Sequence, residues 1–129
     1  MSPNELVDKA RQAMTNAYAP YSGYRVGAAL LCCDGTVITG CNVENASYGL
    51  TNCAERTAVF TAVSKGHSKF TAIAVVSSAD PAPFPCGACR QVLAEFCPAD
   101  FPVYIATHDG YETISLGELL PHTFGASDG

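Results

Sequence analysis

The sequence lacks tryptophan, long apolar runs and any excess of basic residues. Its 129 residues include 7 Lys and Arg against 12 Asp and Glu, a formal net charge of −5. Proteins that bind a nucleic-acid backbone carry basic patches, so this balance argues against a nucleic-acid partner. No apolar stretch approaches the about 18–20 residues that a membrane-spanning helix needs, so we expect no membrane partner.

A secretory leader and a disulfide framework are also not indicated. The first residues, Met-Ser-Pro-Asn-Glu, show neither the basic nor the apolar region of a signal peptide. The cysteine count is seven, an odd number, and Cys32 and Cys33 are adjacent. We therefore expect a cytoplasmic protein with reduced thiols, some of which are available to a metal. We interpret Cys32, Cys33, Cys41 and Cys97 as small buried apolar residues, and the three histidines as surface residues.

The length and the 48% hydrophobic content predict a single domain over residues 1–129 with one core. Helical and alternating apolar patterns, separated by turn residues, predict an α/β fold. A hairpin followed by alternating strands and helices indicates a mixed, about five-stranded sheet in a three-layer α-β-α sandwich. The predicted elements are helices over 2–17, 53–64, 87–96 and 116–120, strands over 25–33, 36–43, 70–77 and 103–107, and a further strand after the turn at 109–110.

Two segments carry the chemistry, and each lies where a predicted helix begins. They are Cys-Ala-Glu-Arg at 53–56 and Pro-Cys-Gly-Ala-Cys-Arg-Gln at 85–91. Free backbone N–H groups and the positive end of the helix dipole stabilise thiolates at this position. Three cysteine ligands leave the fourth tetrahedral position of a zinc ion open for water, as in catalytic zinc sites.

A C-x-x-C motif alone is a weak signal, typical also of redox pairs and of half a structural zinc site. The sequence has no second C-x-x-C or C-x-x-H motif to complete a structural zinc site. Cys41 or Cys97 would each have to supply a single additional ligand. Pairing with an upstream C-x-E motif is the pattern of zinc deaminases, in which the glutamate is not a ligand. The simpler alternative for Glu55 is an acid stabilised by the helix dipole.

Several blocks of the sequence closely resemble the cytidine deaminase family, over roughly residues 5 to 124. These blocks lie at 20–22, 26–30, 40–45, 53–56, 85–91 and 118–121, with Phe124 beyond them. Cysteine rather than histidine at position 53 resembles the small branch of the family. The resemblance implies the cytidine deaminase-like fold and a homotetramer with active sites completed across subunit interfaces, where Tyr48 and Phe124 reach into a neighbouring pocket.

The resemblance also implies a reaction: hydrolytic deamination of cytidine and 2′-deoxycytidine to the uridines, with release of ammonia, in pyrimidine salvage. Zinc is the implied cofactor, held by Cys53, Cys86 and Cys89 and activating a water. Glu55 would carry protons from that water to the pyrimidine ring and the leaving amino group. Deamination of a modified cytosine nucleoside or a nucleoside antibiotic remains an alternative. So does a non-catalytic zinc module that binds protein or RNA.

Four further positions are expected to contact the substrate. Asn42 and Glu44 are two residues apart at a strand end, so their side chains project to the same side. The family resemblance implies a sugar clamp here, whose negative charge disfavours phosphate; a polar strand end is the alternative. Tyr24 stands where the family usually has a phenylalanine against the base, and Ala54 is a further expected contact.

Arg56 is expected to offset the excess negative charge of the three cysteine thiolates around the zinc. Three thiolates and one Zn²⁺ carry a net charge of −1, which weakens the metal as a Lewis acid. Arg56 follows the first ligand by three residues and can donate charge-assisted hydrogen bonds to thiolates. The resemblance implies this task, and a plain surface arginine is the alternative.

Overall fold

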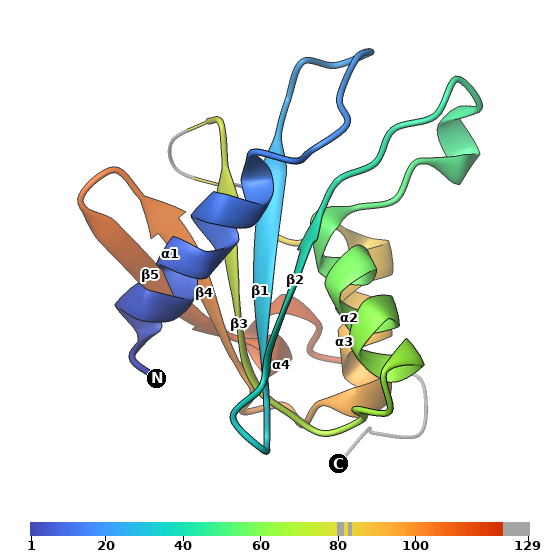
Figure 1. Ribbon diagram of the computed structural model, residues 1–129. Helices are drawn as coiled ribbons and strands as arrows, with labels where there is room; N and C mark the ends of the chain where they lie inside the picture. The colour runs from blue at the N-terminus through green and yellow to red at the C-terminus, as the bar shows by residue number, and fades with distance from the viewer. Residues whose placement is uncertain (80–81, 83, 123–129) are drawn as a thin grey trace.

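Five strands form one mixed sheet in the order β2-β1-β3-β4-β5 (Figure 1). β1 pairs antiparallel with both β2 and β3, β4 lies parallel to β3, and β5 pairs antiparallel with β4. The computed structural model describes residues 1–79, 82 and 84–122. Its elements are α1 (Pro3–Met14), β1 (Val26–Cys32), β2 (Val37–Cys41), the 3-10 turn η1 (Tyr48–Leu50), α2 (Ala54–Ser64), β3 (Phe70–Ser77), α3 (Gly87–Phe96), β4 (Pro102–Thr107), β5 (Gly110–Ser115) and α4 (Leu116–Leu119).

Helices cover both faces of the sheet, which confirms the predicted three-layer α-β-α sandwich (Figure 1). α1 packs on one face, over a core that includes Leu6, Val7 and Ala10. α2, α3 and α4 lie on the other face, over a larger core. α3 connects the parallel strands β3 and β4, as a β-α-β unit requires.

The helix starts follow the predicted local signals, whereas several ends differ. Ser2 caps α1, and its hydroxyl accepts from the Glu5 N–H at 3.2 Å while the Glu5 carboxylate accepts from the Ser2 N–H at 3.1 Å. α1 ends at Met14 rather than at 17. β1 begins one residue later than predicted and β2 ends at Cys41, because the chain beyond Cys41 makes only isolated bridges.

One glycine brings α2 directly onto the sheet and so positions the helix start. A Cβ atom at Gly40 would lie 2.5 Å from the Ala58 nitrogen and 2.6 Å from the Ala54 carbonyl oxygen. Only a residue without a side chain allows this approach. The N-terminus of α2, with Cys53 as its N-cap, is therefore held close to the end of β2.

The cysteines outside the two motifs differ in burial. Cys32 and Cys97 are buried as predicted, but Cys33 is exposed and Cys41 is half-buried. The prediction was wrong for Cys33 because the strand register shifts between Leu31 and Cys32, and Cys33 lies beyond the end of β1.

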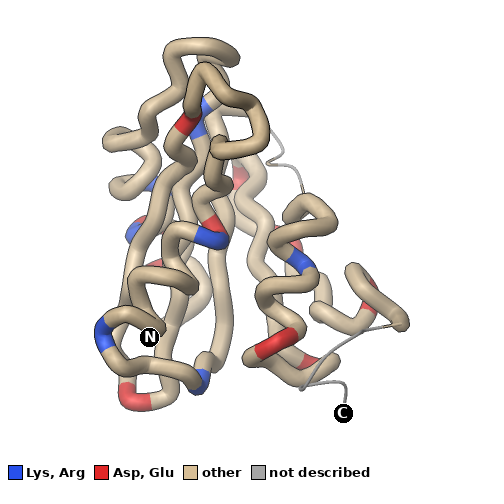
Figure 2. The backbone as a smooth tube through the Cα atoms, turned by 90° about the vertical axis from the view of Figure 1, so that its right-hand side faces the viewer, with Lys and Arg blue, Asp and Glu red and all other residues tan. Residues whose placement is uncertain are grey.

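In the view of Figure 2, the Lys and Arg positions are spread along the chain. Among the described residues, no helix has both the length and the apolar composition that crossing a membrane requires. His67, expected at the surface, is half-buried, with 24% of its side chain exposed.

Candidate metal centre and pocket

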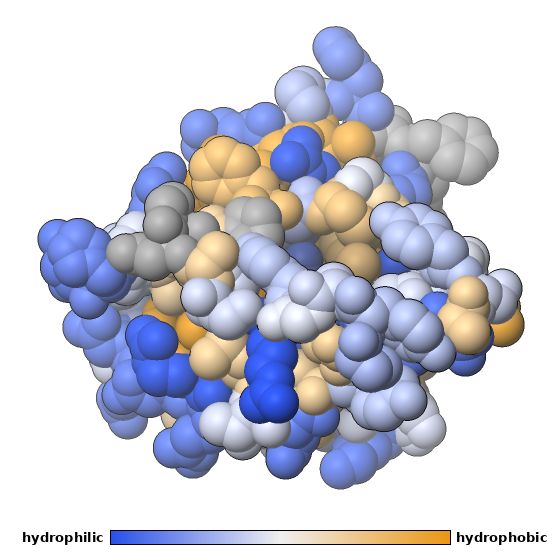
Figure 3. Space-filling model, turned by 90° about the horizontal axis from the view of Figure 1, so that it is seen from above, coloured by the Kyte–Doolittle hydropathy of each residue, from blue (hydrophilic) through white to orange (hydrophobic). Residues whose placement is uncertain are grey.

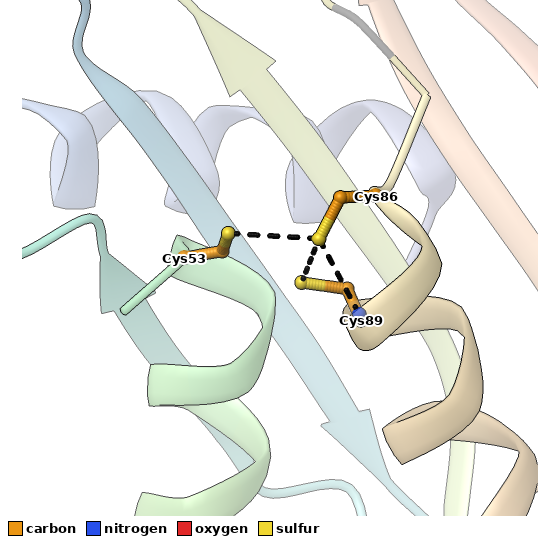
Figure 4. A group of neighbouring side chains, drawn as sticks. All are labelled: Cys53, Cys86 and Cys89. Carbon is orange, nitrogen blue, oxygen red and sulfur yellow. Dashed lines mark hydrogen bonds between the residues drawn. The ribbon is translucent and has the colours of Figure 1, made fainter. Parts of the chain in front are cut away.

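The N-termini of α2 and α3 meet, and this places three thiols together (Figure 4). Cys53 is the N-cap of α2 and Cys86 is the N-cap of α3. The Sγ atoms of Cys53 and Cys86 are 3.7 Å apart, and those of Cys86 and Cys89 are 3.4 Å apart. All three sulfur atoms lie within 4.8 Å of one another, so one ion could contact all of them.

The electrostatics of this cluster fit a divalent cation. The pKa of the Cys53 thiol is lowered to about 5, first because Cys89 donates a hydrogen bond to it and also because Arg56 does. The pKa of Cys89 is raised, chiefly by that same interaction and by burial. Without a cation, one thiolate thus opposes ionisation of its neighbour. Three sulfur donors with room for a fourth ligand are a typical catalytic zinc set, so Cys53, Cys86 and Cys89 would hold the metal.

Arg56 lies against this cluster. Its Nη2 donates to the Cys53 Sγ over 3.3 Å, and its pKa is raised first by that hydrogen bond. The Nε atom of Arg56 is buried and has no hydrogen-bond partner within the part of the chain that the structure describes. A guanidinium with a buried, unpartnered N–H beside the thiols is placed to stabilise negative charge on sulfur.

Glu55 is buried beside the thiols. It follows Cys53 in the first turn of α2 and is only 5% exposed. Burial raises the pKa of its carboxyl group to about 7, while the nearby Arg56 charge acts in the opposite direction. A carboxyl group that titrates near neutral pH can both accept and return a proton.

A cavity of about 270 Å³ opens onto Glu55 and two of the thiols. Apolar groups form much of its wall, and the sequence analysis did not identify three of them: Val26, Val75 and Phe84. Val26 and Val75 belong to the apolar strands β1 and β3, whose sequence pattern indicated burial but not which residue faces a cavity. Phe84 lies in the loop before α3, where no local pattern pointed to a cavity. The lining residues are Val26, Asn42, Cys53, Ala54, Glu55, Val75, Phe84 and Cys86.

Of the expected substrate contacts, Asn42 and Ala54 line this cavity. The Asn42 amide also joins two backbone segments. Its Nδ2 donates to the Tyr24 carbonyl oxygen at 2.8 Å, and its Oδ1 accepts from the Val26 N–H at 2.9 Å. Asn42 therefore fixes the entry to β1, which forms one side of the cavity. Tyr24 itself is not among the lining residues.

Glu44 and Tyr48 line a separate depression of about 230 Å³, whereas Asn42 lines the cavity beside Glu55. The Glu44 carboxylate accepts from the backbone N–H groups of Tyr21 and Ser22, at 3.0 and 3.1 Å. It also accepts a hydrogen bond from the Ser22 hydroxyl, which lowers its pKa more than any other contact does. Sequence reasoning missed Ser22 as a partner of Glu44. Phe124 lies outside the described residues.

Comparisons with known proteins agree with this geometry. Residues 1–105 match a family described as the cytidine and deoxycytidylate deaminase zinc-binding region. The cytidine deaminase of Halalkalibacterium halodurans is 55% identical over 129 residues, covering 99% of this chain and 98% of that protein. That of Sporosarcina psychrophila is 49% identical, covering 99% of this chain and 95% of that protein.

Solved structures show the same fold. The crystal structure of cytidine deaminase from Burkholderia pseudomallei superposes with a TM-score of 0.91 at 48% identity, covering 96% of this chain and all of that one (100%). The crystal structure of cytidine deaminase from Mycobacterium tuberculosis gives a TM-score of 0.83 at 43% identity, covering 98% of this chain and 99% of that one. The chain therefore belongs to the cytidine deaminase family of zinc-dependent hydrolytic deaminases.

Proposed function

We propose that the protein converts free cytidine and 2′-deoxycytidine to uridine and 2′-deoxyuridine, with release of ammonia, in cytoplasmic pyrimidine salvage. The observation that carries the proposal is a buried carboxyl group, Glu55, beside three clustered thiols at the base of a largely apolar cavity. The relatives named cytidine deaminase support the cytidine part. In the overall reaction one C–N bond at C4 of the ring breaks and one C–O bond forms.

The residues divide this chemistry among them. Cys53, Cys86 and Cys89 would hold the zinc, which when bound supplies Lewis-acid activation of a water. Glu55 would accept the two protons of the attacking water in turn, passing the first to N3 of the ring and the second to the departing amino group. Val75 and Phe84, in the cavity wall, fit a planar base and limit the access of bulk water.

The Glu44 carboxylate is proposed to accept the hydroxyl groups of the sugar. A carboxylate has about four acceptor positions, and Tyr21 and Ser22 occupy three of them here. One position thus remains for a ribose hydroxyl, and the carboxylate is held rigidly in place for it. The same negative charge would repel a nucleotide phosphate, which favours nucleosides.

The active site is proposed to be completed in a homotetramer. Glu44 and Tyr48 lie apart from the cavity that holds Glu55. The Tyr48 side chain is 91% exposed, and Leu50, Phe60 and Val63 add further exposed apolar surface. Figure 3, which looks down on the end of the molecule with the long loops, shows hydrophobic residues in orange between hydrophilic ones. Contact with another copy would cover this surface and bring Tyr48 and Phe124 to a neighbouring pocket.

Light scattering together with a Tyr48→Ala variant tests the assembly. We expect a tetramer for the wild type and a loss of nucleoside turnover in Tyr48→Ala that exceeds any loss of thermal stability. A monomer with full activity contradicts the proposal.

The reaction itself is tested by following the absorbance change from cytidine to uridine. We expect turnover that a chelator abolishes and that added Zn²⁺ restores. A panel with modified cytosine nucleosides tests the main alternative, since a strong preference for one of them over cytidine would reassign the substrate. Zinc binding without turnover on any nucleoside would favour the non-catalytic module.

A further inference from the structure

A second group of metal-ligating side chains lies at the opposite end of α2 from the three thiols. Cys32 ends β1, Asp34 lies in the turn between β1 and β2, and His67 follows the last turn of α2. Their sulfur, carboxylate oxygen and imidazole nitrogen all lie within 4.8 Å of one another. The His67 Nδ1 and an Asp34 oxygen are 3.7 Å apart.

The backbone holds two of these ligands in place. The Asp34 carboxylate accepts from the Thr36 N–H at 3.0 Å, and this hydrogen bond lowers the pKa of Asp34, so the group is ionised at neutral pH. The His67 N–H donates to the Ala62 carbonyl at 2.9 Å, which closes the turn after α2 through Gly66 at φ +93°. Short-range backbone hydrogen bonds thus hold Asp34 and His67 in position.

The remaining ligand is buried, while the other two open to solvent. Cys32 is 2% exposed, whereas the Asp34 side chain is 59% exposed beside a depression of about 250 Å³ that His67 also lines. Asp34 and His67 are therefore open to an ion from the solvent, and the Cys32 sulfur lies within 4.8 Å of both of their ligand atoms.

Charge also favours a cation at this place. The C-terminal end of α2 carries the negative end of the helix dipole, and His67 immediately follows that end. One thiolate, one carboxylate and a neutral imidazole balance a divalent ion, unlike the three thiolates of the first site. Lys69 lines the same depression and acts in the opposite direction.

We propose that Cys32, Asp34 and His67 form a second site for a zinc-class divalent transition-metal ion, with water as the fourth ligand. Sulfur, imidazole nitrogen and carboxylate oxygen are the donors that zinc takes in proteins. The site is separate from the deaminase reaction, since α2 spans 11 residues between Cys53 and the C-terminal turn, or about 16 Å at 1.5 Å per residue.

The test uses the zinc-loaded enzyme and Co²⁺ as a spectroscopic probe. We expect a second equivalent of metal per chain and a thiolate-to-cobalt charge-transfer band. Asp34→Asn and His67→Gln should each weaken this binding at least about tenfold, while the first zinc and cytidine turnover stay unchanged. Cys32→Ser removes the third ligand but also changes the core, and that variant could fail to fold. Asp34→Asn and His67→Gln change more exposed residues, so they still test the site in that case.

Two control variants test whether the metal ligands are Cys32 and His67 rather than another cysteine or histidine. Cys33→Ser changes the adjacent exposed thiol, and His108→Gln changes a histidine in a depression at the other end of the sheet. Both should keep the second equivalent and the charge-transfer band. Lys69→Gln should tighten binding by about two- to fivefold, the effect of one solvent-exposed charge. The proposal is overturned if the zinc-loaded enzyme takes up no second equivalent, or if the band is lost in Cys33→Ser and kept in His67→Gln.

Discussion

The Tyr24 hydroxyl donates a hydrogen bond of 3.0 Å to the hydroxyl of Ser77. Ser77 in turn donates to the Ala79 carbonyl at 2.9 Å. The phenol thus connects the segment before β1 to the chain that leaves β3 toward the cavity wall. The family resemblance led us to expect a phenylalanine at position 24, and the extra oxygen of Tyr24 has a partner within the chain.

Tyr24→Phe should therefore change stability and substrate binding only slightly. Ser77 keeps its contact with Ala79, so the loss is one neutral hydrogen bond, about 0.5–1.5 kcal/mol of the free energy of unfolding. We expect the KM for cytidine to change by less than about threefold, as the hydroxyl points to Ser77. Denaturant unfolding and steady-state kinetics measure the two effects. A tenfold loss in kcat/KM at unchanged stability would assign the hydroxyl a direct role in substrate binding.

Glu55→Gln should keep the fold and the zinc of the three-cysteine site while turnover collapses. The amide retains the shape of the buried side chain but cannot carry a proton, and removal of a general acid–base group costs about 10²–10⁴-fold. Metal analysis and the absorbance assay, run on the same preparation, give both quantities. A variant within tenfold of the wild type at full zinc content shows that another group moves the protons.

Glu44→Gln should weaken the binding of nucleosides far more than the binding of free cytosine, because the lost contacts are to the sugar. Loss of hydrogen bonds to a charged group predicts a rise in the KM for cytidine of about ten- to hundredfold. Ser22→Ala keeps the carboxylate but removes its side-chain donor, so its effect should have the same pattern and a smaller size. Equal effects on cytidine and cytosine would place Glu44 outside the binding site.

Arg56→Gln should depress activity at neutral pH and move the pH–rate profile upward. The variant removes the charge-assisted hydrogen bond to Cys53, which leaves more negative charge on the metal ligands. Adding Cys53→His should restore part of the activity, because a neutral ligand then replaces one thiolate. Activity measured from pH 5 to 9 tests both variants, and an unshifted profile in Arg56→Gln would leave charge compensation without support.

The sequence alone determined the elements and the chemistry of the donors, because both depend on near neighbours. The capping pair Ser2 and Glu5 starts α1 as expected, and the N-terminal positions of Cys53 and Cys86 follow from the motifs around them. The hydrophobic pattern also predicted the three-layer fold, which the structure and the comparisons confirm. The roles of the individual site residues stay predictions.

Only the tertiary structure decided which residues share a site, since that depends on strand register and close packing. Gly40 lets α2 lie directly on β2, and the resulting burial of Glu55 raises its pKa to about 7. Asn42 lines the cavity beside Glu55 and Glu44 lines a separate depression, a division that strand alternation alone did not indicate. Cys32 and His67 are 35 positions apart in the sequence and meet only because the hairpin turn and the end of α2 lie at the same end of the sheet.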